Sequence, residues 1–244
     1  MTVNAADLGA LLDLQDHDTR IDQEVHRRAH LPERAELADV GAASAEEEAV
    51  RSSVALLLDV VATRQAEAER ELKATEDRIV QVNRRLYGGT VSASRELQAM
   101  ANDVEGLRRR ASELEDRVLG LMEEREPLDK DLGEHDARLA ELSQRGGELS
   151  ERLGAAEAEV DASLCLLQAQ RQEAASGIAP PLLAAYERLR ARLSGVAVAR
   201  LVGGRCDGCH LSLPAMELDR MRHESAGSLE YCDQCGRILV ISGT

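Results

Sequence analysis

Aromatic residues are almost absent from this sequence, which contains no phenylalanine, no tryptophan and only three tyrosines among 244 residues. Aromatic side chains supply much of the surface that a large compact core buries. The length alone would allow one or two conventional globular domains, but the composition argues against a core of ordinary enzyme size.

Long apolar runs are absent too. No stretch approaches the roughly 20 apolar residues that a membrane-spanning helix needs, and residues 1–20 contain four aspartates where an export signal would be basic and then apolar. The formal net charge of −15 opposes non-specific attraction to nucleic acid and to anionic membranes. We expect a soluble cytoplasmic protein with no membrane partner, in which paired cysteines bind metal rather than form disulfides.

Helix-forming residues are abundant instead. Ala, Leu, Glu, Arg and Lys make up 129 of the 244 residues, a share typical of coiled coils. From Leu97 to Leu167, 21 positions follow one another at alternating spacings of three and four residues and form one seam along a helix. These positions are aliphatic with four exceptions, namely Arg125, His135, Gly146 and Ser163. A seam sustained over ten heptads predicts a coiled coil, which requires a partner helix.

The same chain can supply that partner. A second series of mostly apolar positions precedes the first, and it comprises Val54, Leu57, Val61, Arg64, Ala68, Leu72, Thr75, Ile79, Val82 and Leu86. One extra residue between Ala68 and Leu72 predicts a local change in supercoil. Tyr87, Gly88 and Gly89, followed by hydroxyl residues as far as Ser94, predict a turn, because glycine tolerates positive φ and hydroxyls cap helices.

The predicted fold class is therefore mainly α, with a long antiparallel helical hairpin over residues 1–175 and its turn near 87–94. The alternative is a parallel dimer of two chains, and we expect a monomer or a weak dimer. If the chain folds back at residue 89, Pro32 lies beside Gly146 and Gly147, so both arms would bend at one level unless the match is a coincidence. Arg125 and His135 either meet polar partners that fix the register or extend past the seam into water.

Four of the five cysteines form two CxxC pairs. Cys206 and Cys209 make the first pair, and Cys232 and Cys235 make the second. This spacing is typical of a four-thiolate zinc site, and with no place left for a water molecule it predicts one structural Zn²⁺.

Other interpretations of the cysteines have less support. Residues 206–210 match CxxCH, a haem-attachment pattern, but a haem site would leave the second cysteine pair unexplained. A thioredoxin-like redox pair would need a surrounding strand–helix–strand segment, which is missing here. His210 could replace a cysteine ligand only with awkward geometry, and Cys165 is expected to be an unpaired, solvent-facing thiol.

The C-terminal part differs from the rest in charge. Residues 1–175 contain all 16 excess negative charges, whereas residues 176–244 carry 8 basic and 7 acidic groups. We expect a connecting helix over residues 176–195 and a C4-type zinc ribbon with short β-strands over residues 196–244. A basic patch that could bind nucleic acid or an acidic partner comprises Arg188, Arg190, Arg192, Arg200, Arg205 and Arg237. The alternative is a solvated helix face.

Two motifs together carry a family resemblance. One is Leu86-Tyr87-Gly88-Gly89-Thr90-Val91 followed by Arg95-Glu96-Leu97, and the other combines both cysteine pairs with Leu213-Pro214, Glu217 and Gly236-Arg237-Ile238-Leu239. The chain resembles the bacterial coiled-coil family with a C-terminal C4-type zinc ribbon. That resemblance implies a hairpin with the ribbon beside its open end. It also implies roles as a chaperone-like adaptor in flagellar assembly and type III secretion, partnership with an alternative sigma factor, or RNA binding.

Two functions fit these observations. The first is a non-enzymatic adaptor with a protein partner along the coiled coil and RNA, DNA or a transcription-related protein at the ribbon and its arginines. The second is a protein-binding scaffold or chaperone whose ribbon is purely structural. We predict no enzymatic activity, because the sequence shows no catalytic triad, phosphate-binding glycine loop or open metal site.

Overall fold

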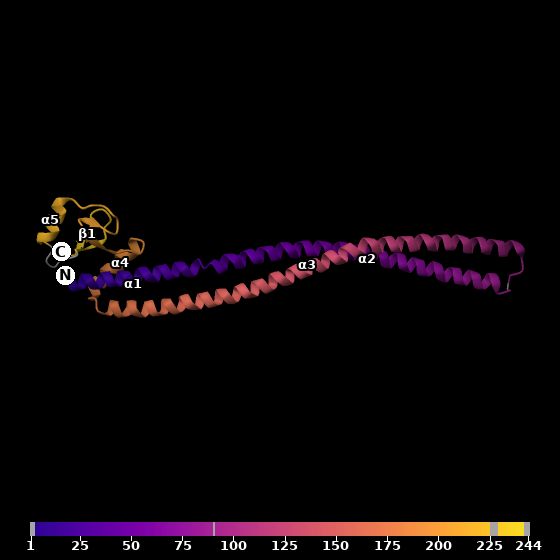
Figure 1. Cartoon of the computed structure of the whole chain (residues 1–244), viewed down its shortest axis with the longest axis horizontal. Helices are drawn as coiled ribbons and strands as arrows, with labels where there is room; N and C mark the ends of the chain where they lie inside the picture. Colours follow the sequence, from indigo (N-terminus) through magenta and orange to yellow (C-terminus); the bar gives the residue numbers. More distant parts are fainter. Residues whose placement is uncertain (1–2, 90, 225–228, 242–244) are drawn as a thin grey trace. The chain divides into compact units, whose positions relative to one another are not determined.

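The computed structural model describes residues 3–89, 91–224 and 229–241 (Figure 1). The chain divides into two compact units. We call Glu36–Leu149 the hairpin unit, and Met1–Ala35 together with Ser150–Thr244 the ribbon unit. Three expectations lie partly outside the described residues, since residues 1–2 belong to the predicted hairpin, Thr90 belongs to the predicted turn, and residues 225–228 and 242–244 belong to the predicted ribbon.

Five helices make up most of the described chain. They are α1 (Ala5–Ala29), α2 (Pro32–Tyr87), α3 (Ser94–Ser176), α4 (Pro180–Arg192) and α5 (Ala215–Glu224). α2 and α3 run in opposite directions through the hairpin unit (Figure 1), which confirms the antiparallel hairpin and the mainly α fold class. Within the described residues, no helix combines the length and the apolar character needed to cross a membrane.

The seam of α3 was predicted correctly, because all 21 positions from Leu97 to Leu167 are buried or half-buried. The seam of α2 was predicted wrongly at two positions. Leu58 and Gln65 face inward, while Leu57 is 57% exposed and Arg64 is exposed. With these corrections the α2 seam keeps regular steps of four and three residues, and no extra residue is present. Three consecutive leucines at 56–58 allow two registers, and the structure adopts the one that places Leu58 in the seam.

Ion pairs between the helices fix the register of the hairpin unit. His135 Nδ1 lies within hydrogen-bonding distance of a Glu47 carboxylate oxygen, and Arg51 Nε donates to Asp136 Oδ1 at 2.6 Å. His135 therefore has a polar partner across the seam, the first of the two alternatives. Arg125 instead pairs with Asp129 on its own helix, at 3.0 Å.

The predicted pairing of Pro32 with Gly146 is wrong. A Cβ atom at Gly146 would lie 3.7 Å from Val40 Cγ1, so Gly146 faces a residue eight positions beyond Pro32. The reason is that α3 begins only at Ser94, which moves the point of reversal beyond residue 89. α1 does end before Pro32, but α3 continues unbroken through Gly146 and Gly147.

A small four-stranded sheet forms the centre of the ribbon unit. Its strands are β1 (Val198–Val202), β2 (Arg205–Cys206), β3 (Glu230–Tyr231) and β4 (Ile238–Ile241), in the order β2-β1-β4-β3. β1 and β4 are parallel, with Val198 opposite Ile238, and the other two pairs are antiparallel. The four short strands agree with the strands expected for a ribbon, and the two longer ones, β1 and β4, contain the β-branched residues.

The N-terminal helix belongs to the core of the ribbon unit. Leu11 and Leu14 of α1 are completely buried in one cluster with Leu182 and Tyr186 of α4 and Ile238 of β4. A second cluster surrounds the cysteines and contains Ala199, Leu201, Leu213, Met221 and Leu239. The ribbon therefore folds on a platform of α1 and α4.

Candidate metal centre

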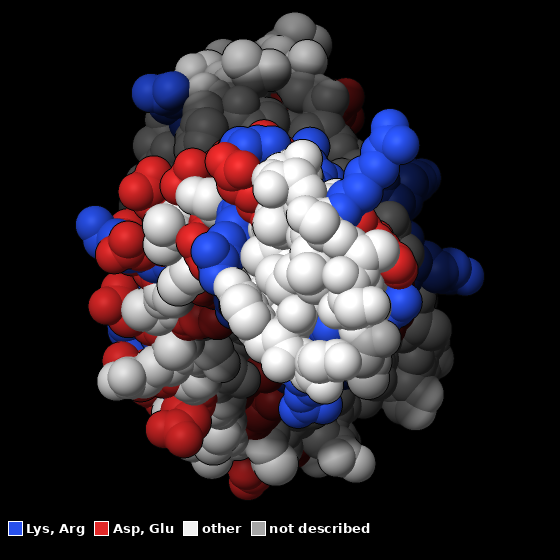
Figure 2. Space-filling model, turned by 90° about the vertical axis from the view of Figure 1, so that its right-hand side faces the viewer, with Lys and Arg blue, Asp and Glu red and all other residues white. Residues whose placement is uncertain are grey.

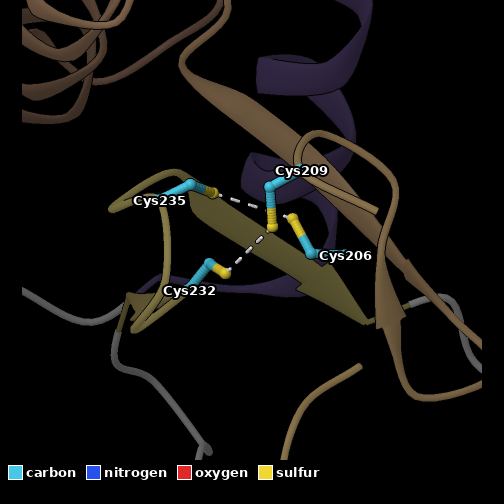
Figure 3. A group of neighbouring side chains, drawn as sticks. All are labelled: Cys206, Cys209, Cys232 and Cys235. Carbon is cyan, nitrogen blue, oxygen red and sulfur yellow. Dashed lines mark hydrogen bonds between the residues drawn. The ribbon is translucent and has the colours of Figure 1, made fainter. Parts of the chain in front are cut away.

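Four cysteine side chains converge in the ribbon unit (Figure 3). Cys206 ends β2, Cys232 follows β3, and Cys209 and Cys235 lie in the turns after them. All four Sγ atoms lie within 4.8 Å of one another. The Cys206–Cys235 and Cys209–Cys232 sulfur pairs are 3.9 Å and 3.8 Å apart.

This geometry fits a zinc ion. Zinc binds thiolates at about 2.3 Å, so the sulfurs of a regular tetrahedral site lie about 3.8 Å apart. The two sulfur separations given above agree with that value. Four thiolates fill the coordination sphere and leave no position for water or substrate, which is the arrangement of a structural site rather than a catalytic one.

The backbone around the cysteines requires glycine at two places. A Cβ atom at Gly208 would lie 2.6 Å from Arg237 Cδ and 3.0 Å from Ala199 Cβ, and Gly236 has a φ of +71°. Each turn is closed by a backbone hydrogen bond, one of which runs from Gly236 N to Cys232 O at 2.7 Å. Gly208 thus leaves room for Arg237 beside the first cysteine pair, and Gly236 supplies the positive φ that follows the second pair.

The thiols differ in acidity because their surroundings differ. Burial raises the pKa of Cys206 to about 12 and also raises the pKa of Cys232. Burial alone would raise the pKa of Cys235 as well, but hydrogen bonds from the backbone and the guanidinium of Arg237 lower it to about 7. Zinc binding must therefore displace protons from buried thiols, which makes metal uptake dependent on pH.

Family comparisons agree with this architecture. Residues 14–194 match the CT398-like coiled coil hairpin domain, and residues 205–239 match the C4-type zinc ribbon domain. The chain belongs to the CT398-like coiled-coil hairpin family. With the sulfur geometry, the match to the zinc ribbon identifies Cys206, Cys209, Cys232 and Cys235 as ligands of one structural zinc ion.

Relatives and solved structures match this member of the CT398-like family over nearly all of its length. Uncharacterized proteins from two strains of Mycobacterium tuberculosis are each 28% identical over 243 residues, covering 98% of this chain and 97% of theirs. A solved Mycobacterium smegmatis protein has a TM-score of 0.90 at 24% identity, covering 99% of this chain and all of its own. CT398 from Chlamydia trachomatis has a TM-score of 0.72 at 18% identity, covering 97% of this chain and 98% of its own. These structures establish the shared fold.

Cys165 and His210 lie outside the group of four cysteines that could bind the metal. Cys165 is an exposed free thiol, as predicted. His210 adopts a φ of +60° directly after Cys209, and its backbone N–H donates to Cys206 O at 2.8 Å. His210 therefore helps to form the turn that carries Cys206 and Cys209.

Most of the predicted basic patch is bound within the ribbon unit. Arg190 pairs with Asp18 and Asp22, and Arg200 pairs with Asp16. The other two bound arginines donate to backbone carbonyls: Arg205 to His210 O and Arg237 to Val196 O.

Two arginines of the patch remain available. In the part of the chain that the structure describes, Arg188 and Arg192 have no ion-pair partner. Both are exposed on α4, one helical turn apart. Together with Ala185, Leu189 and Tyr231 they line a groove of about 380 Å³.

The sequence alone did not predict the polar contacts that join α1 to the rest of the ribbon unit. The Gln15 side chain accepts a hydrogen bond from Ala197 N at 2.6 Å and donates one to Gly195 O at 2.8 Å. Asp18 accepts hydrogen bonds from Arg171 Nε at 2.7 Å and from the Tyr186 hydroxyl at 2.6 Å. A signal was present, because Leu11, Leu14, Asp18 and Ile21 follow one another at steps of three and four residues, which places Asp18 on the apolar face of α1.

Proposed function

We propose that this protein is a non-enzymatic adaptor that binds an anionic macromolecule at its ribbon unit and a protein partner along its hairpin unit. The anionic partner would be nucleic acid or an acidic, transcription-related protein. The groove lined by Arg188, Arg192 and Tyr231 is the observation that supports this proposal most directly. Guanidinium groups bind phosphate and carboxylate in a bidentate fashion, and a tyrosine ring can stack on a base or pack against a partner side chain.

The groove is built on a rigid support. Tyr186 and Leu182 of α4 are buried against α1, and Arg190 on the same helix is bound by two aspartates. The surroundings thus fix α4 and leave the Arg188 and Arg192 side chains facing solvent. A prearranged groove loses little conformational entropy when it binds a ligand.

Gel mobility shifts with RNA and DNA at several salt concentrations test the proposal. We expect binding at low salt that weakens as salt rises, because phosphate contacts release counterions. The R188E/R192E variant should lose affinity by about tenfold or more, whereas R108E/R117E, which makes the same charge change at exposed sites of the hairpin unit, should lose much less. Equal losses, or no binding at low salt, would exclude a nucleic-acid site in this groove.

The second candidate is a scaffold or chaperone that binds proteins through the hairpin unit. Correcting the α2 seam leaves Leu56, Leu57 and Val60 outside it, at 69%, 57% and 54% exposure. Neighbouring exposed aliphatic side chains are typical of protein-binding surfaces. A pull-down from the native host would separate this candidate from the first, because a partner recognised by this surface is lost from L56S/L57S/V60S and retained by R188E/R192E.

A further inference from the structure

The end of the hairpin where the chain reverses has the opposite charge from the arms that lead to it. We define the hairpin tip as residues 78–95. It contains four arginines and no aspartate or glutamate, in a chain of formal net charge −15. The arginines are Arg78, Arg84, Arg85 and Arg95, all of them exposed. Figure 2 looks onto this end and shows uncharged atoms at the front, with Lys and Arg side chains on several sides of them and Asp and Glu side chains gathered mainly on one side.

These arginines are not used to stabilise the hairpin. Within residues 3–89, 91–224 and 229–241, none of the four has an ion-pair partner. Positive charge is favourable at the C-terminal end of a helix, which accounts for Arg84 and Arg85 in the last turn of α2. The same principle makes Arg95 unfavourable, because it lies in the first turn of α3. Helix electrostatics therefore accounts for Arg84 and Arg85 but not for Arg78 and Arg95.

Tyr87 is a second, independent feature of the tip. It is 82% exposed, whereas Tyr186 is completely buried and Tyr231 is 41% exposed. An aromatic ring at that exposure contributes almost nothing to folding. Tyrosine and arginine are the residue types most enriched at the centres of protein interfaces.

The α2 side of the tip has a defined shape. Val82, which belongs to the tip, is buried in the seam. A Cβ atom at Gly88 would lie 2.5 Å from the Arg84 carbonyl oxygen, and Gly89 has a φ of +70°, so both positions require glycine. Tyr87 is therefore followed by two positions at which the backbone requires glycine.

We propose that the hairpin tip is a docking surface that inserts into an acidic recess of a partner protein. The basic segment extends only about 14 Å down α2 at about 1.5 Å per residue, and Asp77 and Glu76 follow it there, as Glu96 does on α3. A long polyanion lying across the tip would meet these carboxylates, whereas a recess that receives only the tip would not. Charge complementarity thus favours a compact acidic protein site over nucleic acid. This surface is distinct from the groove at Arg188 and does not depend on it.

The absence of tryptophan from the chain supplies a reporter for testing the proposal. In Y87W the single indole sits at the tip, and its emission can be followed while the full-length, zinc-loaded protein is titrated. The probes are a six-residue Glu-rich peptide, short enough to contact the tip alone, as a stand-in for an acidic protein surface, a 20-nucleotide single-stranded RNA, and vesicles of phosphatidylglycerol. We expect a saturable emission change with the peptide that weakens with salt. The dissociation constant should rise at least tenfold when R84E, R85E and R95E are added.

The matched control adds R64E, R108E and R117E to Y87W, which makes the same charge change at exposed sites elsewhere in the hairpin unit. Its affinity for the peptide should change less than threefold, and circular dichroism should show equal helicity in all variants. Equal losses in both triple variants would overturn the proposal, as would the absence of any response to the peptide. Tighter tip-dependent binding of RNA or vesicles would assign the surface to a different partner class. Salt-sensitive self-association in sedimentation would assign it to a second copy of this chain. Either result would refute an acidic partner protein.

Discussion

The Tyr186 hydroxyl donates a hydrogen bond to Asp18 Oδ2 at 2.6 Å, although the two residues are 168 positions apart in the chain. Both side chains are almost completely buried, at 0% and 1% exposure. Asp18 also accepts from Arg171 of α3 and pairs with Arg190 of α4. One carboxylate thus joins α1, α3 and α4, and through them it supports the platform on which the zinc ribbon folds.

Removing this carboxylate should destabilise the ribbon unit. In D18A, two partly buried guanidinium groups and a buried hydroxyl lose their common partner, at an expected cost of about 3 kcal/mol. Hydrogen exchange should show the loss as faster opening of α4 and β1. D13A removes an exposed aspartate of the same helix and should leave exchange almost unchanged. Similar exchange in both variants would show that Asp18 does not bind these elements together.

The same contact predicts a loss of stability at alkaline pH. Burial, reinforced by the hydrogen bond to Asp18, raises the pKa of Tyr186 far above its ordinary value. The folded protein therefore keeps a neutral phenol, while the unfolded chain ionises near pH 10. A raised folded pKa contributes stability that is fully present below about pH 10 and is lost as the pH rises further. The melting temperature of the zinc-loaded protein should fall above that pH.

The Y186F variant isolates this effect. It should be less stable than the parent at neutral pH by about 1 to 2 kcal/mol, because Asp18 loses a donor, and its melting temperature should depend less on pH above about 10. Y87F removes an exposed tyrosine and should retain the parent's pH dependence. An unchanged alkaline slope in Y186F would attribute the effect to other groups.

The features that the sequence predicted correctly depend on local spacing. The α3 seam follows from steps of three and four residues, and the zinc ligands follow from two CxxC pairs. The features that it missed depend on contacts between distant segments. The charges at Arg190 and Arg200 looked available in the sequence, but Asp16, Asp18 and Asp22 of α1 bind them in the structure. Counting charge within one segment cannot show that a segment about 180 residues away neutralises it.

Two adjacent leucines provide a test of the corrected α2 seam. Leu58 is half-buried at a seam position, and Leu57 is 57% exposed. We expect L58A to lower the free energy of unfolding by about 2 kcal/mol and L57A to change it by less than about 0.5 kcal/mol. Urea denaturation followed by circular dichroism measures both. A larger effect of L57A would restore the seam through Leu57 and Arg64.

Zinc dependence provides the test of the metal centre. In C232S one of the four thiolates is lost, so the protein should bind much less than one zinc ion per chain. The residues around β1 and β4 should then lose protection from hydrogen exchange, because the metal supplies much of the folding free energy of a small zinc site. Residues 36–149 form a separate compact unit, so most of the helical signal in circular dichroism should remain.

Two controls distinguish a specific zinc site from general damage. C165S removes the exposed free thiol, so it should retain one zinc ion per chain and full protection of the ribbon. Lowering the pH should release zinc from the parent protein, because protons compete for thiols whose pKa values burial raises at Cys206 and Cys232. A C232S protein that kept stoichiometric zinc and a protected ribbon would contradict the four-thiolate site, since three sulfurs would then suffice to bind the metal and order the sheet.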